Sequence, residues 1–399
     1  MALTKDVISK LTFDEEVLDV IVSGHSAIDG LMSFSMKTPE EASQFLRCYG
    51  FELDNPIERA ELFGHFQEAF SFIKNNFLHP ANPEGLRLDI PRKLQELTDP
   101  AQLLLWASTQ SSGQGSLGQW ACAVLKVMHT ISHIDRDIRS SHFADVQMQI
   151  MDGFYKHVHN EDGKLYLGKD RNDPEMVELV LFETKPKKSR ESILLKLLHK
   201  PENVAEDIFD RVGIRFVTKT KLDSLRVIKY LKDRYIIMPA NIKPSRSKNS
   251  LVNVKKFRDE LDRVLKSPDM NWEKAVTALQ KAVGDQEISE NNDNPHTSKE
   301  YAAIQFTCRQ LIKIKNHIYE DIKKLKSLEN SPQSEDIRNT LSRIDLKNIT
   351  REFRFFYPFE VQVSDEKSHL DNMKGQSAHS VYKKNQLMTA MKRVMRGMF

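Results

Sequence analysis

The fold is decided by the stretch Asp210-Arg211-Val212-Gly213-Ile214-Arg215-Phe216-Val217, in which a carboxylate ends a loop and a buried strand follows. Helices are predicted on both sides of this strand, at 191–199 and 221–233. Helices and strands alternate here without a repeat period, which indicates a mixed α+β domain. We therefore expect a mixed β-sheet flanked by helices.

The other strands of this domain are predicted from alternation and from turn signals. Asn160-Glu161-Asp162-Gly163 is typical of a hairpin turn and precedes a strand at 165–167. Further strands are predicted at 176–182, 235–238, 301–309 and 353–363. We expect the domain to span 151–399, with helical insertions near 245–298 and 314–350, and to end in a basic helix at 380–396 whose methionines pack against the protein. An RNA-contacting helix is the alternative for this last element.

Residues 1–150 are predicted to form a separate all-α domain. Thr38-Pro39-Glu40-Glu41 matches a helix start, and Phe63, Phe66 and Phe70 recur at helical spacing. This segment is acidic, with 12 Lys and Arg against 20 Asp and Glu, whereas the rest of the chain holds 47 against 36. The basic part indicates a polyanionic partner such as a nucleotide phosphate, RNA or a membrane surface, and a well-solvated surface is the alternative.

Composition excludes several classes for this chain of 399 residues. It lacks the long apolar stretch of a spanning helix, and its start, Met1 to Asp6, does not resemble a signal peptide. The three cysteines, Cys48, Cys122 and Cys308, are far apart in sequence, which disfavours a disulfide framework or a cysteine zinc site. We expect a cytoplasmic protein without a membrane partner. The oligomeric state stays open, with a homo-oligomer as one alternative.

Two patterns look functional but have simpler explanations. Gly113-Gln114-Gly115-Ser116-Leu117-Gly118 matches the dinucleotide-binding glycine pattern, yet its surroundings look all-helical, so a loop before a helix is favoured. His129 and His133 are four residues apart, the spacing of a metal pair, but their helix also fits a core helix. We expect ordinary histidines there.

The residue types suited to phosphate chemistry lie between 185 and 383. Lys188, Ser192 and Lys196 recur at four-residue spacing and share one helix face. Asp210 at a strand entrance is well placed to hold Mg²⁺, and Gly213 would let the backbone approach a ligand closely. In 359–363, Glu360 and Gln362 point to the same side of a strand, opposite the apolar residues.

In order, these pieces resemble the synthetase domain of the RelA/SpoT alarmone synthetases, a nucleotidyltransferase-like fold, over roughly 185–385. The residues that carry the resemblance are Lys188…Ser192…Lys196, Asp210-x-x-Gly213-Ile214-Arg215, Glu300-Tyr301-Ala302-Ala303-Ile304-Gln305, Glu360-x-Gln362 and His379-x-x-Tyr382-Lys383.

The resemblance implies a pyrophosphokinase that moves the β,γ-diphosphate of ATP to the ribose 3′-hydroxyl of a nucleotide such as GDP or GTP, or of an RNA. By this likeness Asp210 and Glu360 hold Mg²⁺ and Glu360 activates the hydroxyl. Lys188, Ser192, Lys196 and Arg215 would bind the ATP phosphates. The acceptor side would comprise Tyr301, Gln305, Gln362, His379 and Lys383, with Tyr301 stacking on the base.

The sequence also departs from the family pattern. The family's Gly, Ser and His in the third motif are Glu300, Ala303 and Gln305, and the Arg that precedes the first Lys is Pro186. Lys185, Lys187 or Arg190 is a candidate substitute for that Arg. These departures motivate a second hypothesis, a catalytically inactive nucleotide- or RNA-binding regulatory protein. The negative charge of residues 1–150, opposite the basic remainder, motivates a third, in which this region has a regulatory or antitoxin-like role and covers the site.

Overall fold

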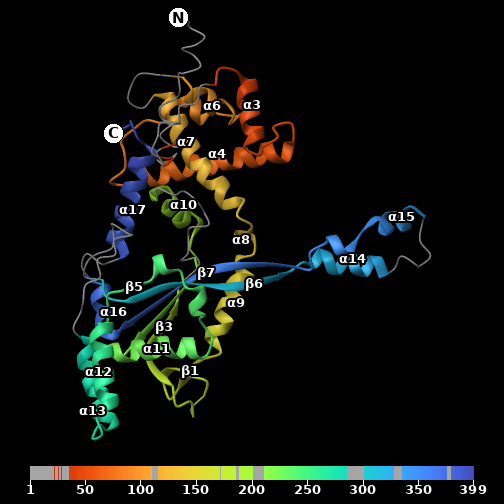
Figure 1. Ribbon diagram of the computed structural model, residues 1–399. Coiled ribbons are helices and arrows are strands. Elements are labelled where there is room, and N and C mark those ends of the chain that lie inside the picture. The colour runs from red at the N-terminus through yellow and green to blue at the C-terminus, as the bar shows by residue number, and fades with distance from the viewer. Residues whose placement is uncertain are drawn as a thin grey trace, which may run out of the picture.

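The computed structural model describes residues 36–109, 116–170, 172–185, 188–200, 211–284, 301–327, 335–374 and 379–399, together with Val22, Ser26 and Ile28. These residues form a helical region, a sheet region and a projecting arm (Figure 1). The prediction of an α+β protein with a mixed sheet flanked by helices is confirmed.

The described residues form one seven-stranded sheet in the order β1-β2-β3-β4-β7-β6-β5. The strands are β1 (Val158–Glu161), β2 (Lys164–Leu167), β3 (Val177–Thr184), β4 (Gly213–Thr218), β5 (Lys248–Asn249), β6 (Ile304–Lys315) and β7 (Glu352–Asp365). The central strands β4 and β7 pair in parallel, and the other described neighbours pair antiparallel. Because Gly213 of β4 pairs with Glu360 of β7, 147 positions later in the sequence, the centre of the sheet depends on long-range pairing.

Seven helices precede the first strand in the described chain. They are α3 (Pro39–Cys48), α4 (Pro56–Asn76), α5 (Arg92–Gln95), α6 (Gln102–Ala107), α7 (Leu117–Asp135), α8 (Ile138–Ser141) and α9 (Phe143–Tyr155). The helix start predicted at Thr38 is confirmed, and Thr38 caps α3 through reciprocal bonds with Glu41. Ser116 and Gln119 form the same capping box at the start of α7, so the segment 116–118 is a helix start, while 110–115 lies outside the described residues.

The later helices are distributed between the three regions. They are α10 (Arg190–His199), α11 (Lys221–Asp233), α12 (Val254–Lys266), α13 (Trp272–Gly284), α14 (His317–Ser327), α15 (Glu335–Arg343), α16 (Glu366–Asn372) and α17 (His379–Val394). Among the described residues, short 3₁₀ turns at Pro239–Asn241 and Pro244–Arg246 lie between α11 and β5, and another at Leu346–Asn348 lies between α15 and β7. No described helix has the length and apolar character that a membrane crossing needs.

The described residues form two hydrophobic cores. The first is built from α3 to α7 and also takes in leucines of α10 and the methionines Met391, Met395 and Met398 of the C-terminal segment. The expected packing of the α17 methionines is thus confirmed. The second core lies on one face of the sheet, where α9 and α11 pack against the apolar residues of β4, β6 and β7.

Of two local sequence predictions, the hairpin is confirmed and one strand is not. The hairpin at Asp162 and Gly163 is present, and both residues have positive φ, as a tight two-residue turn requires. The strand predicted at 235–238 is wrong. Tyr235 has a φ of 56° and ends α11 as a turn, while Ile236 and Ile237 bond back to the carbonyl of Leu231. Ile237 of this run is buried in the second core, whereas Tyr235 and Met238 are exposed.

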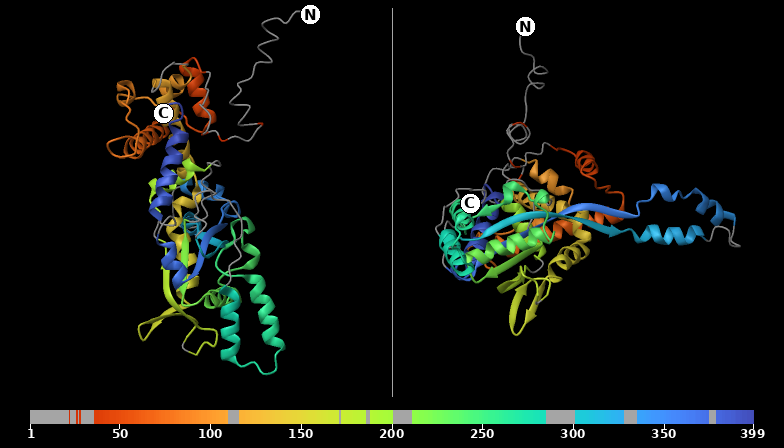
Figure 2. Two further views of the ribbon diagram at one scale, coloured as in Figure 1. Left: turned by 90° about the vertical axis from the view of Figure 1, so that its left-hand side faces the viewer. Right: turned by 60° about the horizontal axis from the view of Figure 1, so that its bottom comes forward.

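The arm is an extension of two sheet strands. β6 and β7 stay paired from Ile304↔Val363 to Lys315↔Glu352, well beyond the strands that flank them. Helices α14 and α15 follow at the far end, and the views in Figure 1 and Figure 2 show this ribbon and its helices projecting from the body. The predicted insertion near 314–350 forms this end, and α12 and α13 form a second projection within 245–298.

Candidate functional site

A row of polar residues crosses the sheet on the face opposite the second core. Ile214 and Phe216 of β4 and Val361 and Val363 of β7 point into that core, so the residues between them point away from it. The strand register places four side chains side by side on this outer face: Glu183, Arg215, Gln362 and Gln305, from β3, β4, β7 and β6. Arg215 donates to Glu183 at 2.8 Å and approaches the amide oxygen of Gln362 at 3.5 Å.

Glu360 is the centre of this polar cluster. Its side chain is 9% exposed, and both carboxylate oxygens accept hydrogen bonds. Lys185 Nζ lies 2.5 Å from Oε2, the Gln362 amide donates to the same oxygen at 3.2 Å, and the Gln305 amide donates to Oε1. Burial of a charged carboxylate costs desolvation free energy unless the charge is paired. Here one cation and two amides compensate the charge of Glu360.

Gly213 makes the contact between Lys185 and Glu360 possible. It stands opposite Glu360 in the parallel β4–β7 pairing, and its carbonyl accepts from the Lys185 backbone on the β3 side. The Lys185 side chain therefore crosses over Gly213 to reach Glu360. A Cβ at position 213 would lie 2.5 Å from Lys185 Cδ, so a larger residue would collide with that side chain. The close approach that we expected at Gly213 is made by a lysine of this chain.

Two further titratable side chains border the cluster. Burial raises the pKa of the Tyr301 phenol, which also responds to the charges of Lys185, Arg215 and Glu360. Burial lowers the pKa of His369 in α16, and Arg215 lowers it further while Glu183 opposes the change. The phenol and the imidazole are therefore both favoured in their neutral forms.

The structure brings together only part of the predicted set. Recorded hydrogen bonds among the described residues join Glu360, Gln362, Gln305 and Arg215, and Tyr301 lies near their charges. Asp210 and Glu300 lie outside the described residues. His379 begins α17 with a side chain that is not described, and Lys383 is exposed on the same helix.

The predicted phosphate-binding residues belong to a different element. Ser192 and Lys196 are on α10, and Lys188 comes two residues before it, all three half-buried. The leucines of α10 pack into the first core beside α7 and α17. Arg190 binds Glu68 and Asp135 of the helical region, whereas Lys185 binds Glu360. Of the candidate substitutes for the family's Arg, Lys185 is therefore the one in the cluster, and Lys187 lies outside the described residues.

The described residues do not by themselves fit a bound Mg²⁺ ion. They contain no group of three or more potential ligands of the His, Cys, Asp and Glu type. Glu360 is the carboxylate at the centre of the cluster, and its oxygens are taken by Lys185 and two amides. A metal here would need the Asp210 carboxylate and the displacement of Lys185.

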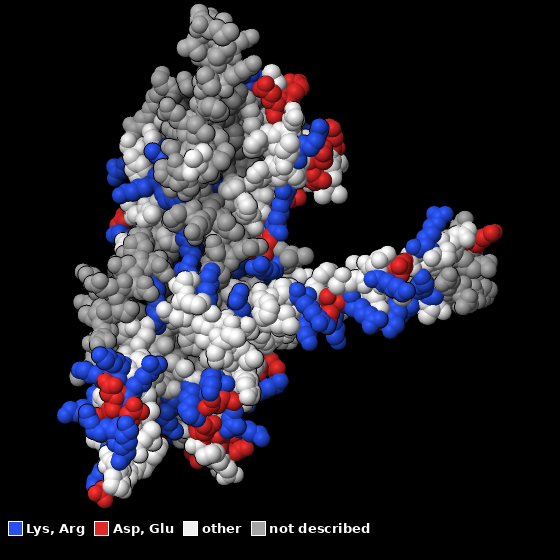
Figure 3. Space-filling model, in the orientation of Figure 1, with Lys and Arg blue, Asp and Glu red and all other residues white. Residues whose placement is uncertain are grey.

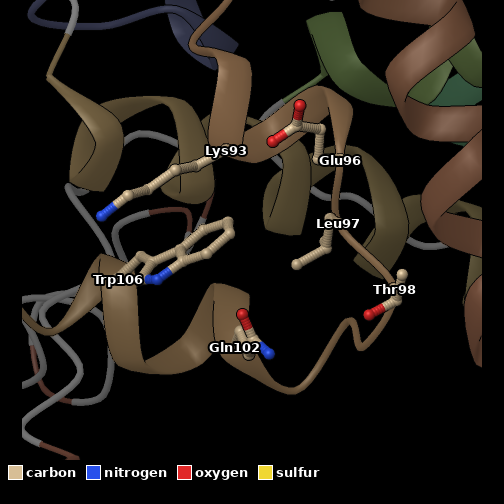
Figure 4. A pocket seen from close by; sticks show the side chains of 6 residues that line it. All are labelled: Lys93, Glu96, Leu97, Thr98, Gln102 and Trp106. Atoms are coloured by element: carbon tan, nitrogen blue, oxygen red, sulfur yellow. The ribbon is translucent and has the colours of Figure 1, made fainter.

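The helical region holds the other titratable groups of note. Burial lowers the pKa of His129 to about 4, His133 contributes to this, and the Tyr49 hydroxyl is hydrogen-bonded to Nδ1 of His129. This agrees with the expectation of ordinary histidines. A separate pocket of about 320 Å³ lies between α5 and α6 (Figure 4), and none of the predicted site residues lines it. Its lining residues are Lys93, Glu96, Leu97, Thr98, Gln102 and Trp106.

Glu183 and His369 were not predicted as members of the cluster. A weak signal exists for Glu183, since it sits two residues before Lys185 at the end of a predicted strand, but its register against Arg215 cannot be read from sequence. His369 follows the Glu360-x-Gln362 motif by seven residues, and no sequence pattern marks it. Comparisons with family models, with curated proteins and with solved structures find no match for this chain.

Proposed function

We propose that the protein is a divergent RelA/SpoT-like pyrophosphokinase with a nucleotidyltransferase-like sheet. In this reaction a ribose 3′-hydroxyl attacks the β-phosphorus of ATP, the bond from that phosphorus to the α,β-bridging oxygen breaks, and AMP leaves. The observation that carries the proposal is the buried Glu360 carboxylate on the outer face of the sheet, in register with Gly213 and surrounded by Lys185, Gln305 and Gln362.

The roles follow from chemical type. The Glu360 carboxylate is the group that can take the proton of the attacking hydroxyl, provided that the hydroxyl reaches it in place of one of its present partners. Lys185 and Arg215 supply positive charge where phosphate charge would develop, a task that depends on fixed position more than on covalent chemistry. Tyr301 offers a ring for the acceptor's base, and Gln305 and Gln362 offer amides beside it.

The proposal includes Mg²⁺, held by Asp210 and Glu360, as the resemblance implies. Bound there, the ion would neutralise phosphate charge. The resemblance also supplies the remaining roles in the proposal. The residues on the ATP side are Lys188, Ser192 and Lys196, and those on the acceptor side are His379 and Lys383. ATP and the acceptor nucleotide are cytoplasmic, so the proposal also assigns the protein to that compartment.

The direct test is incubation with γ-labelled ATP and Mg²⁺ in the presence of GDP, GTP, adenine nucleotides or tRNA. We expect a labelled acceptor and equimolar AMP. Glu360→Gln should reduce the rate by about 100-fold or more, because the variant keeps the shape but loses the base. Glu178→Gln is the matched control, since Glu178 is a strand glutamate of the same sheet paired with Lys219. Absence of labelled product from every acceptor would refute the proposed pyrophosphokinase activity.

One observation favours a second function, a nucleotide-binding regulatory protein without turnover. Lys185 already neutralises Glu360 at 2.5 Å, which leaves the carboxylate compensated in the absence of substrate. Titration calorimetry with the same nucleotides separates the two functions. Binding that does not depend on Mg²⁺ and releases no AMP would support the regulatory protein.

A further inference from the structure

The β6–β7 ribbon has one face that never enters the core. Ile312 and Ile314 of β6 and Tyr357 of β7 are buried on its other side. On the exposed face, the register pairs Leu311 with Phe356 and then Lys313 with Arg354. We call these four residues, with Arg309 and Lys315 on the same face, the ribbon track.

The ribbon track combines an exposed ring with unpaired cations. Phe356 is 49% exposed and Leu311 is 41% exposed, so the pair presents an apolar contact to solvent. The Arg309 guanidinium lies 6.0 Å from the centre of the Phe356 ring. Among the described residues, Arg309, Lys313 and Lys315 form no ion pair with a carboxylate, and Glu352, which stands opposite Lys315 in the register, binds Arg354. Figure 3 shows Lys and Arg side chains continuing along the arm.

The ribbon track is continuous with the candidate site. Gln305 and Thr307 of β6 and Glu360 and Gln362 of β7 lie on the same face, since side chains two residues apart on a strand share a side. Phe356 stands four residues before Glu360, which corresponds to about 13 Å along the strand. A ligand that lies on the ring and the cations would therefore run toward the cluster around Glu360.

We propose that the ribbon track binds a single-stranded polynucleotide. A flat aromatic ring beside regularly spaced cations fits unpaired bases and their phosphates, because a base stacks on the ring while the cations contact the backbone. A duplex keeps its bases stacked inside and cannot use Phe356 in this way. A second copy of the chain would bring cations of the same sign together, which charge repulsion disfavours.

The test is fluorescence anisotropy with labelled oligo-uridylate of about 15 nucleotides, with oligo-deoxythymidylate of the same length and with a duplex. We expect both single strands to bind better than the duplex. With three or four phosphate contacts, the slope of log K against log salt should be about −2 to −3. Lys313→Ala and Lys315→Ala should each reduce that slope by about 0.7.

The ring is tested separately from the charges. Phe356→Ala should weaken binding by about 5-fold to about 150-fold with an unchanged salt slope, and Phe356→Trp should restore it. Controls are Trp272→Ala, which removes an exposed ring on α13, and Lys74→Ala, which removes an exposed cation on α4. Both should bind as the unchanged protein does. Urea unfolding of the Phe356 variants checks that each is folded.

Three results would overturn the inference: equal affinity for duplex and single strand, no loss of affinity in Phe356→Ala, or no binding by either oligonucleotide. Sedimentation that shows a dimer in the unchanged protein and a monomer in Phe356→Ala, without oligonucleotide binding, would assign the track to a second copy. Binding is measured without ATP, so its failure and failure of the proposed transfer reaction are separate outcomes.

Discussion

The ion pair between Lys185 and Glu360 makes a quantitative prediction about the sheet. Lys185→Met keeps most of the side chain that crosses Gly213 but removes the ammonium 2.5 Å from the carboxylate. Glu360→Gln keeps the shape of the other partner and removes its charge. Together with the double variant, these two changes form a cycle that isolates the energy of the pair.

The expected loss in the free energy of unfolding follows from the burial of the Lys185–Glu360 pair. Removing one partner of a buried pair costs about 3–5 kcal/mol, because the other charge is left without compensation. The Lys185 side chain is 23% exposed, and the amides of Gln305 and Gln362 still donate to Glu360. We therefore expect Lys185→Met to cost about 2 kcal/mol, below the usual range. The double variant should be more stable than the sum of the single changes by about 1–2 kcal/mol.

The assay is urea unfolding of the four proteins at neutral pH. The surface pair of Lys219 and Glu178, at 2.7 Å in the same sheet, is the matched control, because its lysine side chain is 52% exposed. A parallel cycle with Lys219→Met and Glu178→Gln should give clearly weaker coupling. Coupling below about 0.5 kcal/mol in the Lys185–Glu360 cycle would refute the view that this carboxylate depends on a buried cation.

Three further outcomes are expected. Gly213→Ala should lower the free energy of unfolding by about 1–3 kcal/mol, since its Cβ meets Lys185 Cδ, and urea unfolding in a Lys185→Ala background should show a smaller loss. His129 is held neutral, with a folded pKa of about 4 against an ordinary value of 6.5, so stability should fall as pH decreases from 6.5 to about 4. Urea unfolding across this range should show a smaller fall in His129→Phe, and an equal fall would contradict the assignment. Arg190→Ala should destabilise the contact of α10 with α4 and α7, measured by hydrogen exchange, and Arg190→Lys should restore only part because it cannot hold both Glu68 and Asp135.

The faces of the central strands could be predicted from sequence. Alternation in 301–309 and in 359–363 assigned Ile304 and Val361 to the buried side and Gln305 and Glu360 to the other side, and the structure confirms this. The reason is physical. A sheet covered by helices on one side imposes a period of two on every strand, and that period is visible in the sequence itself.

The partners across strands could not be predicted. Glu183, Arg215, Gln362 and Gln305 come from four separate strands, and a shift of one residue in any pairing would turn a side chain to the other face. Lys185 follows β3 and reaches Glu360 only because Gly213 lacks a side chain at the crossing point. The sequence offered three candidate cations for this position, and only the register between β3, β4 and β7 distinguishes Lys185 from Arg190.

The shared first core decides how the role of the helical region can be studied. Leu194, Leu197 and Leu198 of α10 are buried against α7 and its neighbours, and Met391 and Met395 of the C-terminal segment enter the same core. Deleting residues 1–150 would expose these side chains and also remove the first eight residues of α9, which packs on the sheet. A loss of activity in such a truncation would report unfolding as readily as regulation. Substitutions at Arg190 can separate unfolding from regulation. Arg190 lies five residues beyond Lys185 and binds the helical region instead of the sheet, so we expect its loss to weaken the contact of α10 with that region and to leave both cores intact.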